Sequence, residues 1–194
     1  DIGDVTASPT TYTVSGTVTD SSSTPIAGAT VQLCTTGTDA TTSVIPTSTT
    51  DSNGKYSFTN VSEGSYTIKA SKNGYDVWSG DIQINGNITS KDITLTQSTT
   101  YNVWVGGTQV TSANKDNVLG NGAVTYTPDT NTLTLNGVTI TNTTENTSGI
   151  KASNDLTIAL IGEYNTISGT GHAIEMTNGT LTITGPGSLN ASSS

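Results

Sequence analysis

The sequence of 194 residues is poor in charged residues, in aromatic residues and in cysteine. Its one cysteine, Cys34, excludes an intrachain disulfide and a zinc site built from cysteines. Because Cys34 ends the apolar stretch TVQLC, we expect a small buried side chain and not a reactive thiol, which needs an electropositive setting. Asp and Glu outnumber Lys and Arg by 15 to 6, and the net charge of -9 argues against nucleic acid or an anionic membrane as partner.

Long hydrophobic runs are also lacking. No stretch approaches the ~20 apolar residues that span a bilayer, and no charged segment followed by an apolar one opens the chain as in a secretory signal. Residues 1–11 have the character of a linker. The composition, rich in Thr, Ser and Asn and poor in Lys and Arg, is typical of an exported bacterial surface protein. We therefore expect a secreted or cell-surface fragment whose signal and anchor lie outside this sequence.

Alternating apolar residues predict β-strands throughout the chain. The hydrophobic fraction of 31% is low enough to suggest disorder, but Val14 and Val18, and later Ile82 and Ile84, recur with the period of two that a strand requires. The chain length fits two small domains. We expect an all-β protein with domains at residues 12–96 and 101–194, joined by a hinge at residues 97–100 that has no hydrophobic anchor.

Turn residues separate the strands predicted in the first domain. Between Val14 and Tyr75 the segments VSGTVTD, PIAGATVQL, TDSNGKYSF and GSYTIKASKNGY follow one another, with a hydroxyl-rich loop expected from Thr35 to Thr47. DSNG, residues 51–54, predicts a hairpin turn with positive φ at Asn53 and Gly54. A calcium loop is the alternative, but it would need more acidic positions and a bidentate Glu six residues after the glycine.

This order of strands and turns resembles the carboxypeptidase regulatory-like family, β-sandwiches of transthyretin-like topology carried on exported bacterial proteins. The resemblance implies that the aromatic residues at the family's positions form the core; these are Tyr56, Phe58, Tyr66 and Tyr75. It implies a module without chemistry of its own, and we expect this sandwich to serve as a spacer and the second domain as a display surface. A related module carries a Lys to Asn isopeptide bond that starts from a lysine on its first strand. TYTVSGTVTD has no lysine, so we expect no such bond.

Trp78 is the one speculative ligand platform in the sequence. It lies in DVWSGD, just after the last Gly-Tyr of the family pattern. An exposed indole there could stack on a sugar ring, and partial burial under a loop is the alternative. In the second domain, Trp104 and Tyr126 lie in the expected hairpins YNVWVGGTQVT and AVTYTPDTNTLTL, so we expect both to be packed and Trp104 to be buried.

From Leu133 the sequence repeats itself. LTLNGVTI, LTIALIGEYNTI and LTITGPGSLN begin 23 and 25 residues apart, and periods of this size indicate a solenoid. Stacked repeats would form two aliphatic ladders and one outward threonine row. The expected sets are Leu133, Leu156 and Leu181; Ile150 and Ile174; and Thr134, Thr157 and Thr182.

The pattern resembles the carbohydrate-binding-type β-helical repeats of secreted gut-bacterial proteins, in which Y-x-x-W-V-G-G-x-x-V-T leads into L-T-L-N-G. The implied fold is an incomplete right-handed parallel β-helix with an N-terminal hairpin cap. Leu181, Ile183 and Leu189 would then lie unprotected at the C-terminal edge. Self-association through this open solenoid end is therefore a further expectation.

Catalytic arrangements find little support in the sequence. His172, the only histidine, could form an acid/base pair with Glu175, but a solvated histidine in a turn is the alternative. Asp155, Glu163 and Glu175 fall at different phases of the repeat, so nothing predicts a carboxylate pair, and Ser168 with Asp155 completes no nucleophile arrangement. No cluster has the spacing of a metal or cofactor site.

These observations favour a non-catalytic module of an exported surface protein, active in adhesion or carbohydrate binding. Its expected partner is a glycan or a host or cell-surface protein. Two alternatives stay open. One is part of a polysaccharide-degrading enzyme whose groove lies on repeats outside this sequence, and the other is a purely structural stalk.

Overall fold

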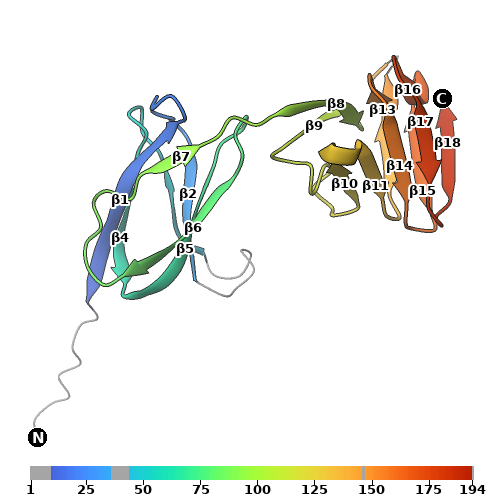
Figure 1. Cartoon of the computed structure of the whole chain (residues 1–194). Helices are drawn as coiled ribbons and strands as arrows, with labels where there is room; N and C mark the ends of the chain where they lie inside the picture. Colours follow the sequence, from blue (N-terminus) through green and yellow to red (C-terminus); the bar gives the residue numbers. More distant parts are fainter. Residues whose placement is uncertain (1–9, 36–43, 146, 194) are drawn as a thin grey trace, which may run out of the picture. The chain divides into compact units, whose positions relative to one another are not determined.

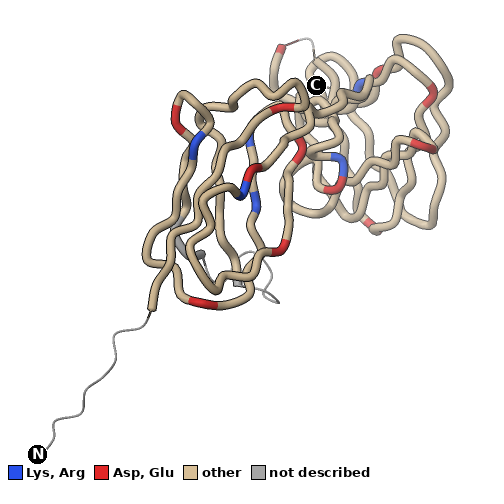
Figure 2. The backbone as a smooth tube through the Cα atoms, turned by 60° about the vertical axis from the view of Figure 1, so that its left-hand side comes forward, with Lys and Arg blue, Asp and Glu red and all other residues tan. Residues whose placement is uncertain are grey.

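The computed structural model describes residues 10–35, 44–145 and 147–193. The described chain is all-β, with one short 3-10 helix, η1, at Pro128–Thr130. It divides into two compact units, Asp1–Gln97 and Ser98–Ser194 (Figure 1). Acidic residues are spread over both units, and basic residues are few (Figure 2). Within the described residues, no helix is long and apolar enough to cross a membrane.

Two sheets make up the first unit. Its strands are β1 Thr11–Asp20, β2 Thr30–Thr35, β3 Val44–Thr49, β4 Lys55–Ser62, β5 Gly64–Ser71, β6 Trp78–Ile84 and β7 Ile93–Leu95. One sheet has the order β4-β1-β7 and the other β3-β2-β5-β6. Both contribute inward-facing apolar side chains to a shared core, in keeping with the alternation of side chains along a strand. This sandwich core contains Val14 and Val18 of β1 and Leu33 and Ile68 of the other sheet.

The aromatic residues of the first unit lie in or against this core, as predicted. Tyr56, Phe58 and Tyr66 are buried, and Tyr75 packs against them partly exposed. The rings of Tyr56 and Phe58 meet edge to face with centroids 5.7 Å apart. The Tyr56 hydroxyl donates to the carbonyl of Lys91 at 2.5 Å, and burial raises the pKa of Tyr56 well above its usual value. Cys34 is buried, as expected.

Three expectations for the first unit need correction. The hairpin expected at residues 51–54 does not form, because β3 pairs with β2 whereas β4 pairs with β1, so this turn joins the two sheets. Only Gly54 has positive φ there, and the Asp51 carboxylate accepts the N–H groups of Asn53 and Lys55. The loop expected from Thr35 to Thr47 is shorter, since β3 begins at Val44, and residues 36–43 lie outside the described part. Strand β1 begins at Thr11, inside the expected linker, whose residues 1–9 are also outside it.

The second unit contains three sheets. Its strands are β8 Thr100–Val105, β9 Thr108–Thr111, β10 Val124–Thr127, β11 Thr132–Leu135, β12 Thr139–Asn142, β13 Ser148–Ala152, β14 Leu156–Leu160, β15 Asn165–Gly169, β16 His172–Met176, β17 Leu181–Thr184 and β18 Leu189–Ser193. The sheet orders are β10-β11-β14-β17, β12-β15-β18 and β16-β13-β8-β9. The segment expected as a hinge is partly joined to this unit, because Thr99 and Ser112 exchange hydrogen bonds and Thr100 begins β8.

From β11 onward, successive strands visit the three sheets in a fixed order and pair in parallel with the strand one repeat earlier. Ile150 lies beside Ile174, as predicted. The ladder expected from Leu133 is wrong at its first step, because Leu133 pairs with Ile158, 25 residues on, and not with Leu156. Its second step is confirmed, since Leu156 pairs with Leu181, and Ile158 pairs in the same way with Ile183. The outward threonine row is correspondingly Thr132, Thr157 and Thr182 instead of the row expected from Thr134. A shift of two residues preserves the inward face, so alternation alone does not fix the register.

Burial decreases along the parallel strands. Leu133 and Ile158 are fully buried, whereas Ile183, the next member of their row, is 47% exposed. Leu181 and Leu189 are partly exposed and pack against the same core. Strands β16, β17 and β18 therefore present a partly apolar edge at the end of the described repeats.

Candidate functional site

Four outward-facing side chains form a line across the sheet β16-β13-β8-β9. Lys151 lies beside Glu175 on one side and beside Trp104 on the other, and Trp104 lies beside Gln109. We call these four residues the Trp104 row. The chain neighbours of Trp104 and Lys151 are buried, which places the row on the outer face because side chains alternate along a strand.

A pocket of about 230 Å³ opens beside this row. Its lining combines one indole with amide, hydroxyl, ammonium and carboxylate groups; the residues are Trp104, Gly107, Asn142, Thr147, Ser148, Lys151 and Glu175. They come from β8 and the turn after it, from the end of β12 and the start of β13, and from β16. Trp104 and Glu175 are far apart in sequence and contribute to one surface only because β13 pairs with both β8 and β16.

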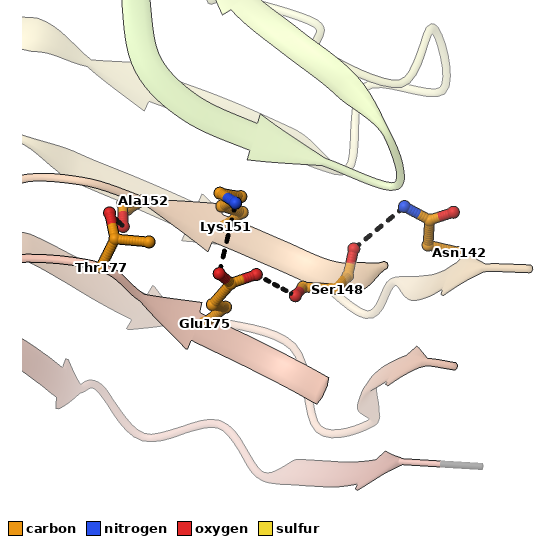
Figure 3. Close-up of polar contacts among 6 residues, drawn as sticks. All are labelled: Asn142, Ser148, Lys151, Ala152, Glu175 and Thr177. Atoms are coloured by element: carbon orange, nitrogen blue, oxygen red, sulfur yellow. Dashed lines mark hydrogen bonds and ion pairs between the residues drawn. The ribbon is translucent and has the colours of Figure 1, made fainter. Parts of the chain in front are cut away.

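Glu175 is held by two partners in this pocket (Figure 3). Its Oε1 lies 3.2 Å from Nζ of Lys151, and its Oε2 accepts a hydrogen bond from Oγ of Ser148 at 2.7 Å. The hydrogen bond from Ser148, followed by that from Lys151, lowers the pKa of Glu175 below its usual value, and the charge of His172 adds a smaller effect in the same direction. Glu175 is therefore ionised at neutral pH.

Asn142 fixes the start of β13. This asparagine is 8% exposed, and its Nδ2 donates to the carbonyl of Ser148 at 3.0 Å (Figure 3). Its Oδ1 accepts from the backbone N–H of Thr144 at 3.2 Å. Because both polar atoms of the amide are engaged within the protein, Asn142 positions Ser148, which in turn orients Glu175.

This arrangement suits binding more than bond cleavage. The acids considered in the sequence are not brought together: Asp155 accepts the N–H of Thr180 before β14, Glu163 is exposed in the turn before β15, and Glu175 lies in β16. His172 is exposed at the start of β16, three residues from Glu175 and so on the opposite side of the strand. Ser168 donates to Oγ1 of Thr141, its partner on the neighbouring strand of the same sheet.

Comparison with known proteins supports the family resemblance of the first unit. Residues 13–96 match the family model of the carboxypeptidase regulatory-like domain. The match covers the predicted sandwich and ends before the Trp104 row. A search of curated protein sequences found no match.

Solved structures similar to the chain come from proteins of different kinds. They include the Bacillus anthracis TIE protein (20% identity, TM-score 0.36), a streptococcal ancillary pilin (19%, 0.39) and chlorocatechol 1,2-dioxygenase from Pseudomonas putida (12%, 0.35). The similarity covers 45%, 49% and 45% of this chain and 17%, 35% and 60% of theirs. The chain thus spans less than two thirds of each, and similarities this weak assign no function.

Within the first unit, the ring of Trp78 is in contact with its neighbours. It is partly buried against the sandwich core. A Cβ atom placed on Gly80 would lie 2.7 Å from the ring, so the indole covers this glycine closely. Nζ of Lys91 lies over the ring, 5.7 Å from its centroid, within the range of a cation–π contact. The indole of Trp78 is thus partly buried, the alternative that the sequence left open.

The expectation that Trp104 is buried is wrong. Its ring is half-buried and lines the pocket. The sequence contained a signal for this position, because Trp104 stands between Val103 and Val105, and two inward valines put the residue between them on the outer face. Lys151 stands between Ile150 and Ala152 in the same way. The pairing that places Lys151 beside Trp104 joins distant segments and has no local signal.

Proposed function

We propose that the chain belongs to an exported, cell-surface or secreted bacterial protein and that its second unit is a non-catalytic carbohydrate-binding module. The observation that carries the proposal is the position of the Trp104 indole beside the Lys151–Glu175 pair in an open pocket. An indole face packs against the apolar C–H face of a sugar ring, while the charged pair offers donors and acceptors to its hydroxyl groups.

We infer further that residues 101–194 are an N-terminally capped, right-handed parallel β-helix. Support comes from the fixed order in which the strands visit three sheets and from steps of 24 and 25 residues between paired isoleucines. The antiparallel strands β8, β9 and β10 would serve as the cap. In this architecture each repeat packs on its neighbours, which holds the Trp104 row on a rigid surface, and the preceding domain acts as a spacer.

Binding of immobilised glycans by the full chain tests the function. Trp104→Ala should lose about 2 kcal/mol of binding free energy, roughly 30-fold in Kd, as is typical when a central tryptophan is removed. Trp78→Ala is the matched control and should bind like the unmodified protein. Circular dichroism and thermal unfolding would establish that both variants are folded. Unchanged glycan binding by a folded Trp104→Ala protein would contradict the proposal.

A further inference from the structure

Resting on the proposed function, we propose that the Trp104 pocket selects a neutral pyranose and rejects sugars that carry a carboxylate, with Lys151 and Glu175 contacting adjacent hydroxyl groups. Pocket size is the first argument. Ligand pockets commonly enclose about 300–1,000 Å³, and the pocket here, at about 230 Å³, lies below that range. It therefore suits one sugar ring, with the rest of a glycan extending into solvent.

Charge is the second argument. Among the described residues that line the pocket, Lys151 is the one cation and Glu175 the one anion, and they face each other at 3.2 Å. A sugar carboxylate that bonds to a free donor of Lys151 would lie close to the Glu175 carboxylate, and repulsion between the two negative groups would offset the attraction of Lys151. The net charge of -9 adds a repulsive field around the whole chain. A neutral sugar is repelled neither by Glu175 nor by the net negative charge of the chain.

Unused hydrogen-bonding capacity is the third argument. An ammonium group has three donors and a carboxylate about four acceptor sites. Lys151 uses one donor on Glu175, and Glu175 accepts from Lys151 and from Ser148. Free donors and free acceptors thus lie side by side, which complements two neighbouring hydroxyl groups that each donate and accept. Trp104 lies one strand away, ~4.8 Å across the sheet, where it can cover the ring face.

Matched sugar pairs test this selectivity in the unmodified chain. Methyl glucoside, methyl galactoside and methyl mannoside would be titrated by calorimetry or NMR beside the corresponding methyl uronides, which differ only in a carboxylate at C6. We expect at least one neutral sugar to bind at least about tenfold more tightly than its uronide. A uronide that binds as tightly as its neutral partner would overturn the selectivity while the proposed function stands. If no sugar of any pair binds, the proposed function itself fails.

Variants that change the charge of the pocket test the same selectivity independently. Glu175→Gln frees Lys151 from its partner, so the uronides should gain affinity and the preference for the neutral sugar should shrink or reverse. Asp116→Asn is the matched control, because it frees Lys115 from an exposed pair outside the pocket, and the preference should not change. An unchanged preference in folded Glu175→Gln protein would also overturn the inference. If Glu175→Gln does not fold, the sugar pairs on the unmodified chain still decide the question.

Discussion

Oδ1 of Asn165 accepts a hydrogen bond from the backbone N–H of Val138 at 3.3 Å, across 27 positions of sequence. The Nδ2 of the same side chain donates to the carbonyls of Gly162 at 2.7 Å and Ser188 at 3.1 Å. Asn165 is 1% exposed. One amide thus bonds to the backbone of three successive turns at the corner where the chain passes to the sheet β12-β15-β18.

Replacement of Asn165 by Ala should destabilise the second unit. The substitution removes the side-chain partner of the Val138 N–H and of the Gly162 carbonyl, whereas the Ser188 carbonyl still accepts the backbone N–H of residue 165. An unsatisfied buried polar group costs about 1–3 kcal/mol. Urea unfolding of the full chain, monitored separately for the two units, would measure the loss. Asn178→Ala, at an exposed turn position, serves as the control and should stay within about 0.5 kcal/mol. Equal stability of the two variants would mean that the amide is dispensable.

Replacement of Gly162, which lies in one of the stacked turns, should also destabilise the second unit. A Cβ atom there would lie 2.1 Å from the backbone nitrogen of Gly137 in the preceding turn, and backbone cannot move aside as a side-chain tip can. Gly162→Ala should therefore lower the thermal midpoint clearly. Gly86→Ala, which would meet nothing within 4 Å, should leave the midpoint almost unchanged. If Gly162→Ala unfolds at the same temperature as the unmodified protein, the neighbouring turns are less closely packed than in the structure.

Ile158 and Ile183 occupy the same row but should tolerate truncation differently. Ile158 is fully buried, so Ile158→Ala should cost about 2–5 kcal/mol of unfolding free energy. Ile183 is 47% exposed, and Ile183→Ala should cost less than half as much. Comparable losses, measured by urea unfolding in dilute solution, would mean that another surface covers Ile183.

The pKa of Glu175 should depend on its hydrogen bonds with Ser148 and Lys151. Its folded-state pKa lies below the ordinary 4.5, so its stabilising effect is complete above pH 4.5 and is lost as the pH falls through the lowered value. Carboxyl NMR titration should show Ser148→Ala raising the pKa of Glu175, because the first hydrogen bond is then gone. Ser168→Ala, whose hydroxyl contacts Thr141, is the control. A pKa unaffected by Ser148→Ala would contradict the observed geometry.

Much of the fold could be predicted from the sequence, because alternation and turn residues are local signals. The strands follow from them, whereas the aromatic core around Tyr56 and Phe58 was implied by the family resemblance and the pairing of Ile150 with Ile174 by the sequence repeat. The register of Leu133 could not be predicted, since pairing with Leu156 or with Ile158 buries the same face and only the packed turns distinguish the two. The pocket was missed for a related reason. Its residues meet through strand pairings between distant segments, and no local pattern in the sequence indicates those pairings.

The most direct measurement of the central claim is the response of the two indole N–H signals to a bound sugar. Trp78 and Trp104 are the two tryptophans of the chain, so a nitrogen-15 spectrum contains one indole signal for each. Single substitutions of either tryptophan assign them. On titration with the neutral methyl glycosides, the signal of Trp104 should shift in proportion to binding while that of Trp78 stays in place. A shift of the Trp78 signal alone, or no shift of the Trp104 signal when sugar is bound, would contradict the assignment of the ligand site to the Trp104 row.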